Sequence, residues 1–536
     1  MKKFNKYIAL ALGALALTSC EDLDTEYLGY YVTTDQKQNT LEQNPEMAQA
    51  GVTGIFASLN KYGQIYGTDA HFDFGYPAIM IGLDLQGADM ISVNSGYNHF
   101  NYWEGFTSPT AGGTPSGMAW YNMYDQVFSA NAVAATIPAD TEDDLLKFYR
   151  AQAVGARAFD YWVLAQLYQF NYAGNEDKPC VPIITDENSE EAAANGCPRA
   201  SVAETYAQIL KDINEAIELL NATTYTPEQV IDSKPKRMIS KAVAYGLQAR
   251  VYLTMHKYAE AATAAQNAIG SFSGRPFSIA EVSVPTFTSI DEPSWMWGIA
   301  MAETDRPVTT GICNFPSMMG SFCYGYCTVG AWKWLNMKVY DEIPASDVRK
   351  GWFLDENLDS KNLNASQKAY LSDFEGTLEA YTQVKFGPYK GVLGQTTNAC
   401  DIPLMRVEEM YYILAEGQAM SGNVAAAKTT LENFVKTYRD PKFAVADGIT
   451  AEEFQDLVYQ QRRVEFFGEG LSWFDIMRLN KVIDRTNSNF PPAYSFYIEP
   501  NDPCRIYCIP TGEINGNPQI SDADNNEEGT RPSPVA

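Results

Sequence analysis

The sequence predicts a mostly α-helical protein, in which paired helices form a scaffold that carries long irregular loops and a few short strands. Three observations lead to this prediction. Apolar residues recur at three- and four-residue spacing in separated pairs of segments, small residues alternate with large ones inside them, and Gly-, Pro- and aromatic-rich stretches lie between them. Of the 536 residues, 46% are hydrophobic and 20% are charged, so the chain is able to bury a large core without disulfides or metals.

The N-terminus has the pattern of an export signal. Lys2, Lys3 and Lys6 precede an uncharged apolar run over residues 8–17, which is too short to span a bilayer and has the length of a signal-peptide core. We therefore expect residues 1–19 to be removed as a signal peptide. No later stretch reaches 18 consecutive apolar residues, so no other segment is expected to span a membrane.

The end of this run resembles a bacterial lipobox, which implies that Cys20 becomes the lipid-modified first residue of the mature chain. A plain secretory signal followed by an unrelated cysteine is the alternative. Glu21, Asp22 and Asp24 form an acidic cluster that resembles the surface-export tag of outer-membrane lipoproteins. Acyl chains contribute about 0.8 kcal/mol per buried CH₂. We therefore expect a protein anchored in outer-membrane lipid through Cys20 and facing the cell exterior.

The first strong helical signals lie in the N-terminal half of the chain. Residues 148–168 place alanines and larger apolar residues at helical spacing, which produces a face of small side chains. Ser201 and Glu204 form a capping box that predicts a helix from this point through Leu220.

Two predicted helix pairs follow, near residues 240–269 and 408–437. A turn near His256 separates the helices of the first pair, and a turn at Gly422 and Asn423 separates those of the second. Helix–turn–helix units with small residues between large ones resemble tetratricopeptide repeats, although each unit lacks several consensus positions.

Two long stretches, residues 66–117 and 271–345, show little helical period and are rich in Gly, Pro, Ser and aromatic residues. Loops of this length in a compact protein are usually functional or disordered, and their aromatic content argues against disorder. We expect an N-terminal region at 20–225, with repeat helices and aromatic ligand-binding loops, and a C-terminal region at 226–536 that contains both helix pairs.

Charge and motif content exclude several classes of function. Lys and Arg number 39 against 66 Asp and Glu, and the resulting net charge of −27 repels nucleic acid. Three histidines leave little material for histidine catalysis or a zinc site. The chain contains no G-x-S-x-G elbow, H-E-x-x-H or P-loop motif, and the acidic segment 522–528 lacks the turn glycine of a calcium loop. We therefore predict a protein that is not an enzyme, binds no metal or cofactor, and ends in a solvated acidic tail.

Eight cysteines follow Cys20, and their spacing does not define which of them pair. Cys180 and Cys197 bracket an acidic loop and form the local pair most suited to a disulfide test. Buried free thiols are the simpler expectation, since a chain of this length does not need cross-links.

Four motifs resemble a single family. Residues 462–478, RRVEFFGEGLSWFDIMR, closely resemble the RR-x-E-F-x-G-E-G…W-F-D-I-x-R signature of the RagB/SusD family of outer-membrane nutrient-binding lipoproteins. Residues 406–416 resemble its R-x-E-x-Y…A-E helix, residues 156–161 its R-A-F-x-Y helix, and residues 509–518 its C-terminal I-P-x-x-E-I-x-x-N-P motif. The order is that of the family, but Ser472 replaces a frequent Arg and an acidic, Pro-containing tail follows the last motif.

This resemblance implies a SusD-like fold without catalytic activity. It also implies a place as a lid on a SusC-like TonB-dependent transporter, with the repeat-bearing helical side against the transporter barrel. Ligand contacts in the family come from the irregular face that lacks the repeats.

The charged residues of the signature allow two interpretations. Glu465 and Glu469 would be the carboxylate pair of a glycoside hydrolase. Alternatively, the charged residues at helical spacing join neighbouring helices, and we favour this interpretation because carboxylate pairs are frequent among 66 acidic residues. The other charged residues of the signature are Arg462, Arg463, Asp475 and Arg478.

The candidate ligand-binding residues lie in two aromatic segments of the predicted loops. Sugar rings offer C–H faces to aromatic side chains and hydroxyls to amides, so rings mixed with amides favour carbohydrate capture. The first segment supplies Tyr97, Asn98, Asn101, Tyr102 and Trp103, and the second supplies Tyr324, Tyr326 and Trp332.

We therefore predict a cell-surface lipoprotein that captures oligosaccharides and delivers them to a SusC-like transporter. Two alternatives remain open, a peptide-binding RagB-like uptake protein and a helical-repeat scaffold without a ligand of its own.

Overall fold

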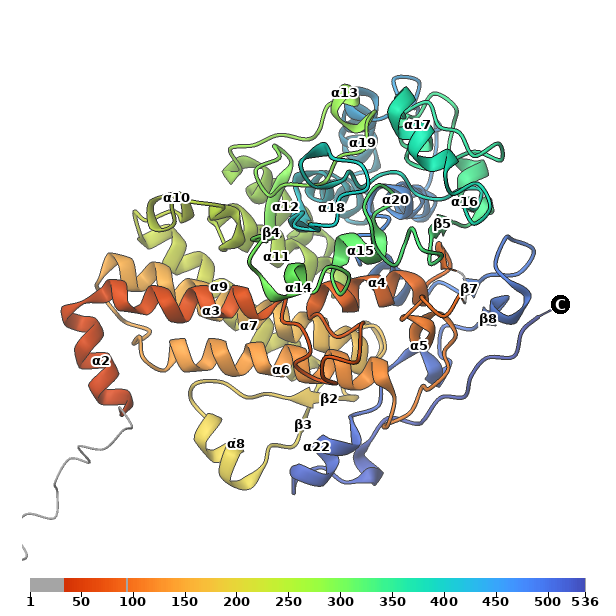
Figure 1. Ribbon diagram of the computed structural model, residues 1–536. Helices are drawn as coiled ribbons and strands as arrows, with labels where there is room; N and C mark the ends of the chain where they lie inside the picture. The colour runs from red at the N-terminus through yellow and green to blue at the C-terminus, as the bar shows by residue number, and fades with distance from the viewer. Residues whose placement is uncertain (1–32, 93–94, 536) are drawn as a thin grey trace, which may run out of the picture.

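The computed structural model describes residues 33–92 and 95–535 of the chain (Figure 1). The predicted signal peptide and Cys20 lie outside the described residues. The described chain is mostly helical and contains four small sheets, which confirms the predicted fold class.

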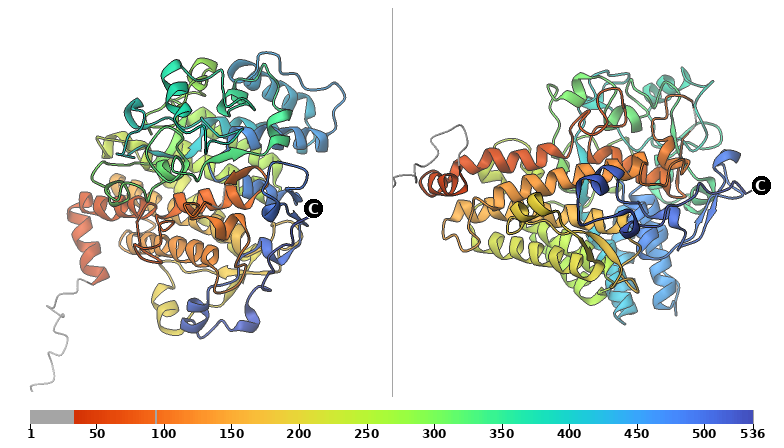
Figure 2. Two further views of the ribbon diagram at one scale, coloured as in Figure 1. Left: turned by 45° about the vertical axis from the view of Figure 1, so that its right-hand side comes forward. Right: turned by 90° about the horizontal axis from the view of Figure 1, so that it is seen from below.

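Long helices form the scaffold. They are α2 (Thr34–Gln43), α3 (Gln49–Ser58), α4 (Tyr76–Gln86), α6 (Thr114–Ala134), α7 (Asp144–Tyr168), α9 (Val202–Ala222), α11 (Lys241–Thr254), α12 (Tyr258–Ser271), α18 (Val407–Met420), α19 (Val424–Tyr438) and α20 (Ala451–Glu465). They pack largely in chain order: α6 on α7, α7 on α9, α9 on α11, α11 on α12, and α12 on α18, which also contacts α19 and α20. Figures 1 and 2 show the early helices running side by side across one half of the molecule and the later helices in the other half.

Most of these helices occupy segments that the periodicity predicts. Helix α7 covers residues 148–168, and α9 begins at the Ser201 capping box. The two predicted pairs are present as α11–α12 and α18–α19. Small residues allow close approach, because a Cβ at Gly417 of α18 would lie 2.6 Å from the Tyr258 carbonyl oxygen of α12.

Helix α4 lies inside a stretch where the sequence shows little helical period. All 11 of its residues are buried. Because protein surrounds the helix on every side, it has no polar stripe, and the pattern that reveals a surface helix is missing. The expectation of an irregular loop over all of residues 66–117 is therefore wrong.

The strands of the described chain are short and pair in twos, always antiparallel. They are β1 (Met90–Ser92) with β5 (Lys333–Leu335), β2 (Pro179–Pro182) with β3 (Arg199–Ser201), β4 (Trp295–Ile299) with β6 (Ile402–Arg406), and β7 (Ile483–Asp484) with β8 (Tyr497–Ile498). The β1–β5 pair connects the two predicted aromatic segments, since β1 leads into one and β5 follows the other.

Short helices interrupt the loops between these elements. They are α5 (Asn101–Glu104), α8 (Ser189–Asn195), α10 (Pro227–Val230), α13 (Ile279–Val282), α14 (Arg306–Thr309), α15 (Phe315–Met319), α16 (Met337–Glu342), α17 (Ala365–Ser372), α21 (Ser472–Arg478) and α22 (Thr511–Gly516). The 3₁₀ turn η2 (Pro235–Arg237) and helix α14 border a large pocket, which is described below.

Two glycines separate α20 from α21. Gly468 and Gly470 have φ values of 82° and 72°, in the left-handed region that side chains rarely adopt. A Cβ at Gly470 would lie 2.7 Å from the Cβ of Met80, so the turn also passes close against α4.

The C-terminal tail is held by the protein and is not the free solvated segment that its acidity predicts. Arg199 donates one hydrogen bond to the Asp524 carbonyl oxygen at 2.6 Å and another to Asn526 Oδ1 at 2.9 Å. Asn526 Nδ2 in turn donates to the Tyr168 carbonyl oxygen at the end of α7, at 2.7 Å.

Farther along, the tail crosses residues 105–111, the segment that follows α5 (Figure 1). The Gly529 N–H donates to the Pro109 carbonyl oxygen at 2.9 Å, and Arg531 Nε donates to the Gly105 carbonyl oxygen at 3.0 Å. The end of the chain therefore fixes a loop that lies more than 400 residues earlier in the sequence.

The eight cysteines within the described residues are free thiols, so the Cys180–Cys197 disulfide is not formed. Between residues 33 and 535, leaving out 93 and 94, no helix has both the length and the apolar character needed to cross a membrane.

Candidate functional site

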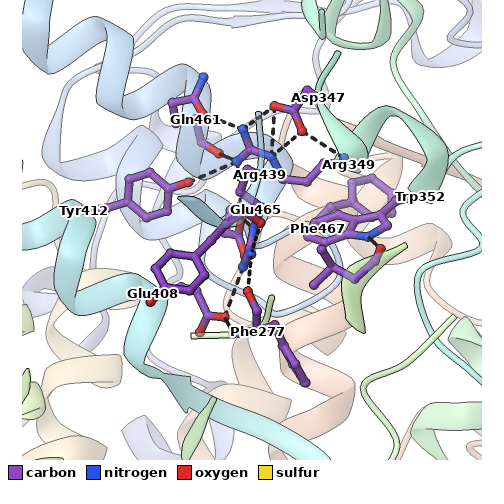
Figure 3. A network of polar contacts seen from close by, with 12 residues as sticks. Phe277, Asp347, Arg349, Trp352, Glu408, Tyr412, Arg439, Gln461, Glu465 and Phe467 are labelled. Atoms are coloured by element: carbon purple, nitrogen blue, oxygen red, sulfur yellow. Dashed lines mark hydrogen bonds and ion pairs between the residues drawn. The ribbon is translucent and has the colours of Figure 1, made fainter. Parts of the chain in front are cut away.

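The charged signature at residues 462–478 lies inside the protein, where it forms part of a network of ion pairs (Figure 3). Glu465 contacts Arg439 at 2.8 Å, Arg406 at 3.0 Å and Arg349 at 3.2 Å. All four side chains are fully buried. They come from distant parts of the chain, so the network joins α20 to the segments around it.

Neither glutamate of the signature has the properties of a catalytic acid. Burial alone would raise the pKa of Glu465, but the three arginines outweigh burial and hold its pKa well below the usual range. Burial opposes ionisation of Glu469 as well, yet Arg406 at 2.8 Å and Lys385 at 2.6 Å lower its pKa overall. Both carboxylates are charged, paired and shielded from solvent, which supports their interpretation as structural residues.

The rest of the signature joins helices in the same way. Asp475 of α21 contacts Arg462 of α20 at 2.7 Å and Arg478 at 2.8 Å. Arg478 also contacts Glu416 of α18 at 2.5 Å. The predicted role of these residues as charged links between neighbouring helices is confirmed.

One arm of the network reaches the strand that leads into the first aromatic segment. Arg463 contacts Asp89 at 2.5 Å, and the Ser472 hydroxyl donates to the other carboxylate oxygen of Asp89 at 3.1 Å. Asp89 directly precedes β1. The buried network therefore helps to fix the position from which the aromatic loop departs.

The pairing of β1 with β5 brings residues from both aromatic segments together. Tyr97 is 47% exposed and Tyr324 is 52% exposed, whereas Tyr326 is only 6% exposed. The Tyr326 ring centroid lies 6.1 Å from Tyr97, 4.6 Å from His99 and 5.6 Å from His71, and its hydroxyl forms a hydrogen bond with His71 Nδ1. The exposed Tyr324 lies close enough to Tyr326 to influence its hydroxyl electrostatically. We call these five residues the aromatic face: the exposed tyrosines Tyr97 and Tyr324, and a base formed by Tyr326, His71 and His99.

Two groups in the base of the aromatic face, His99 and Tyr326, are uncharged at neutral pH. Burial, followed by the neighbouring His71 and Lys333, lowers the pKa of His99 to about 4. Burial also raises the pKa of Tyr326 to about 12. His99 and Tyr326 therefore stay neutral and offer hydrogen-bonding groups, a character that suits hydroxyl-rich ligands.

A buried carboxylate supports the segment that carries Tyr97. Glu104 of α5 accepts hydrogen bonds from the Ser92 N–H at 2.7 Å and from Asn98 Nδ2 at 2.8 Å. Burial raises the pKa of Glu104 to about 7. The two ends of the segment are thus attached to one side chain.

A second group of rings lies next to the aromatic face. Tyr102 and Tyr66 are each 42% exposed, and both pack edge-on against Phe72, at centroid distances of 6.0 and 5.7 Å. Phe72 follows His71 in the chain, so one loop supplies both groups. Asn101 lies half-buried at the start of α5.

Trp103, a predicted ligand-binding residue, is a core residue instead. Its side chain is 1% exposed and packs against Phe72 and Phe100. The ring also lies over Gly82 of α4, where a Cβ would come within 2.7 Å of three ring atoms. No face of the ring is left for a ligand.

Trp332 and Asn98, which were also predicted to bind ligand, are core residues as well. Trp332 is 0% exposed and packs edge-on against Phe374, and Asn98 is 3% exposed and bound to Glu104. Large rings gain more by burial than any other side chain. Composition alone cannot separate a ring that fills the core from one that meets a ligand.

The sequence interpretation named no ligand-binding residue in the loop between α3 and α4, which supplies Tyr62, Tyr66 and His71, although residues 66–117 are expected to be functional. A signal was present, because two tyrosines and three glycines fall within residues 62–75. What the sequence could not give was the position of this loop between the two predicted segments. In the part of the chain that the structure describes, no three His, Cys, Asp or Glu side chains form a group that could hold a metal ion.

Comparison with known proteins agrees with this architecture. Residues 83–253 match a family described as starch-binding associating with outer membrane, and residues 319–526 match the SusD family. The chain is 23% identical over 512 residues to SusD-like protein P2 of Formosa agariphila, which covers 89% of this chain and 91% of that protein.

Solved structures show the same fold. A SusD-like carbohydrate binding protein from Bacteroides vulgatus has a TM-score of 0.71 at 22% identity, covering 90% of this chain and 98% of that one. A SusD superfamily protein from Bacteroides thetaiotaomicron has a TM-score of 0.70 at 20% identity, covering 92% and 100%. A laminarin binding SusD-like protein has a TM-score of 0.61 at 19% identity, covering 90% and 98%.

The fold and its exposed rings define a class of protein, a tetratricopeptide-like helical scaffold whose irregular loops present an aromatic surface. Within that class, this chain belongs to the SusD/RagB family.

Proposed function

We propose that this protein is an outer-membrane lipoprotein that binds oligosaccharides at the aromatic face. The observation that carries the proposal is the pair of exposed rings, Tyr97 and Tyr324, near a base in which His99 and Tyr326 are neutral and His71 is hydrogen-bonded to the Tyr326 hydroxyl. Exposed tyrosines offer flat surfaces for sugar C–H groups, and the base supplies donors and acceptors for hydroxyls. Tyr102 and Asn101 would extend the surface for longer chains.

We further propose that the protein delivers its ligand to a SusC-like TonB-dependent transporter and breaks no bond itself. The family description, which places related proteins at the outer membrane, supports this location. Two structurally similar proteins, a laminarin binding SusD-like protein and a surface glycan-binding protein in complex with laminarihexaose, support glycan as the ligand class. The anchor would be Cys20, with the chain facing the exterior.

The geometry implies weak binding. Ring contacts of about 0.5–1.5 kcal/mol each and hydrogen bonds of about 1 kcal/mol each give millimolar to micromolar dissociation constants. Weak binding suits a protein that must release its ligand to a partner.

Calorimetry with neutral oligosaccharides and mixed peptides tests the proposal. We expect an oligosaccharide to bind, and the Tyr97→Ala, Tyr324→Ala double variant to weaken binding about tenfold or more without a change in melting temperature. Phe128→Ala is the matched control, because Phe128 is a 71% exposed ring on α6 away from the aromatic face.

Other outcomes lead to the alternatives. Binding of peptides alone would indicate a RagB-like protein. If neither class binds while the protein still associates with its transporter, a scaffold role without a ligand would replace our proposal. Release of reducing sugar by the purified protein would contradict the absence of catalysis.

A further inference from the structure

A large pocket lies beside the aromatic face. It has a volume of about 630 Å³ and is bordered by the end of α3, the turn η2, the residues after β4 and the start of α14. This is large enough for one or two sugar rings. Neither the signature residues nor the predicted aromatic residues line it.

Tyr62 connects the pocket to the aromatic face. Its side chain lines the pocket and contacts Cys313. Tyr326 is near enough to interact electrostatically with the Tyr62 hydroxyl. On the other side, the Arg306 guanidinium lies over the Tyr62 ring, 5.6 Å from the centroid. A ligand lying on Tyr326 that continues past Tyr62 would therefore meet Arg306.

The charge of the pocket is opposite to that of the whole protein. Four cations line it, against one acid, in a chain with a net charge of −27. The cations are Lys61, Lys234, Arg237 and Arg306, and the acid is Asp305. A positive pocket in such an acidic surface attracts anions locally.

Two of the cations are already neutralised. Lys61 pairs with Asp125 at 3.2 Å, and Lys234 pairs with Asp401 at 2.6 Å. Asp401 is buried, so the second pair is part of the wall.

The two arginines differ from the lysines. Among the described residues, neither Arg237 nor Arg306 forms an ion pair, and Nε of Arg237 is buried without a hydrogen-bond partner. A buried guanidinium N–H without an acceptor is costly, and an anion in the pocket would satisfy it.

We infer that this pocket binds the acidic group of an anionic oligosaccharide, whose neighbouring sugars lie on the aromatic face. The inference rests on the proposed function and narrows its ligand to glycans that carry carboxylate or sulfate. Arginine matches either anion through paired N–H donors, whereas an uncharged hydroxyl would leave both guanidinium charges unpaired.

The test compares hexasaccharides of equal length by calorimetry with the purified protein. Oligogalacturonate and alginate provide carboxylate alone, carrageenan provides sulfate alone, chondroitin sulfate provides both, and malto-, cello- and laminarihexaose are neutral. We expect at least one acidic probe to bind about tenfold or more tightly than every neutral one, and to lose that advantage as ionic strength rises from about 0.05 M to about 0.5 M. The carboxylate and sulfate probes show which anion the pocket prefers.

Arg306→Gln and Arg237→Gln should each remove most of the difference in affinity between acidic and neutral hexasaccharides. Neither variant should change the affinity for the neutral ones. Arg306 is exposed, so its replacement should not disturb folding. Lys211→Gln is the matched control, because Lys211 is a 54% exposed cation on α9 that is paired with Glu187 and lies outside the pocket. It changes the net charge equally and should leave binding unaffected.

The experiment distinguishes failure of this inference from failure of the proposed function. If neutral hexasaccharides bind as tightly as acidic ones, or if Lys211→Gln reduces acidic binding as much as Arg306→Gln, the inference is wrong while the proposed function stands. If no oligosaccharide of either kind binds, both are wrong.

Discussion

The network around Glu465 and the aromatic face are both built from aromatic and polar residues, yet they use them in opposite ways. In the network, Glu465 is paired with three arginines and shielded from water. In the aromatic face, Tyr97 and Tyr324 expose half of their surface. The residues of the family signature thus form the ion pairs that hold the helices of the scaffold together. The loops outside the signature carry the surface on which a ligand would lie.

The largest effect should come from breaking the network. Glu465→Ala leaves Arg349, Arg406 and Arg439 buried near one another without their shared carboxylate, and should cost about 3–5 kcal/mol of unfolding free energy. Urea denaturation measures this. The control Arg275→Ala, which removes an exposed pair with Glu281, should cost at most about 1 kcal/mol. Equal losses of unfolding free energy in the two variants would show that the buried network contributes no more to stability than an exposed ion pair.

A second variant separates core rings from surface rings. Trp332→Ala removes a fully buried ring and should cost about 3–5 kcal/mol, whereas Tyr324→Ala should cost less than about 1 kcal/mol. Thermal melts of both variants test this. A Trp332→Ala protein with unchanged stability would contradict the burial described above.

A third prediction concerns pH and the support of the Tyr97 segment. Burial raises the pKa of Glu104 from 4.5 to about 7. Between these values the folded protein keeps a proton that the unfolded chain has lost. This stabilising contribution is fully present below the lower value and is lost as pH rises through the upper one, a total of about 3 kcal/mol.

Glu104→Gln should therefore reduce the loss of unfolding free energy between about pH 5 and about pH 8. Denaturant titrations across this range measure the slope. Asp84→Asn serves as a second variant for comparison, because burial also raises the pKa of Asp84 to about 7 at a position away from the Tyr97 segment. Identical pH profiles for wild type and Glu104→Gln would refute the assignment.

The smallest effect should come from the edge of the exposed surface. Tyr102→Ala should weaken binding of long oligosaccharides about two- to tenfold and leave short ones unaffected, since its ring lies beyond the aromatic face. Calorimetry with a series of chain lengths measures this. A loss that is equal at every length would place Tyr102 in the aromatic face itself.

The scaffold could be predicted because its signals are local. Capping residues, helical spacing and the signature at residues 462–478 each describe a single segment, and α7, α9 and the two helix pairs follow from them. Helix α4 escaped prediction because it is buried on every side and has no polar stripe.

The candidate site was predicted only in part. Tyr97 and Tyr326, one from each predicted segment, come together at a ring-centroid distance of 6.1 Å, but Trp103 and Trp332 turn inward. Whether a ring faces water depends on what covers it, which involves residues hundreds of positions away. His71 joins the face through the Tyr326 hydroxyl, a contact across 255 residues that no local pattern indicates.

The C-terminal tail makes contacts that are able to form only after almost all of the chain has been synthesised. Residues 105–111, which carry the chain away from Tyr102, are held by Gly529 and Arg531. During synthesis and export these loop residues emerge early but meet their partners last. All the residues of α2 to α20 are therefore available before the contacts that hold this loop beside Tyr102 are able to form.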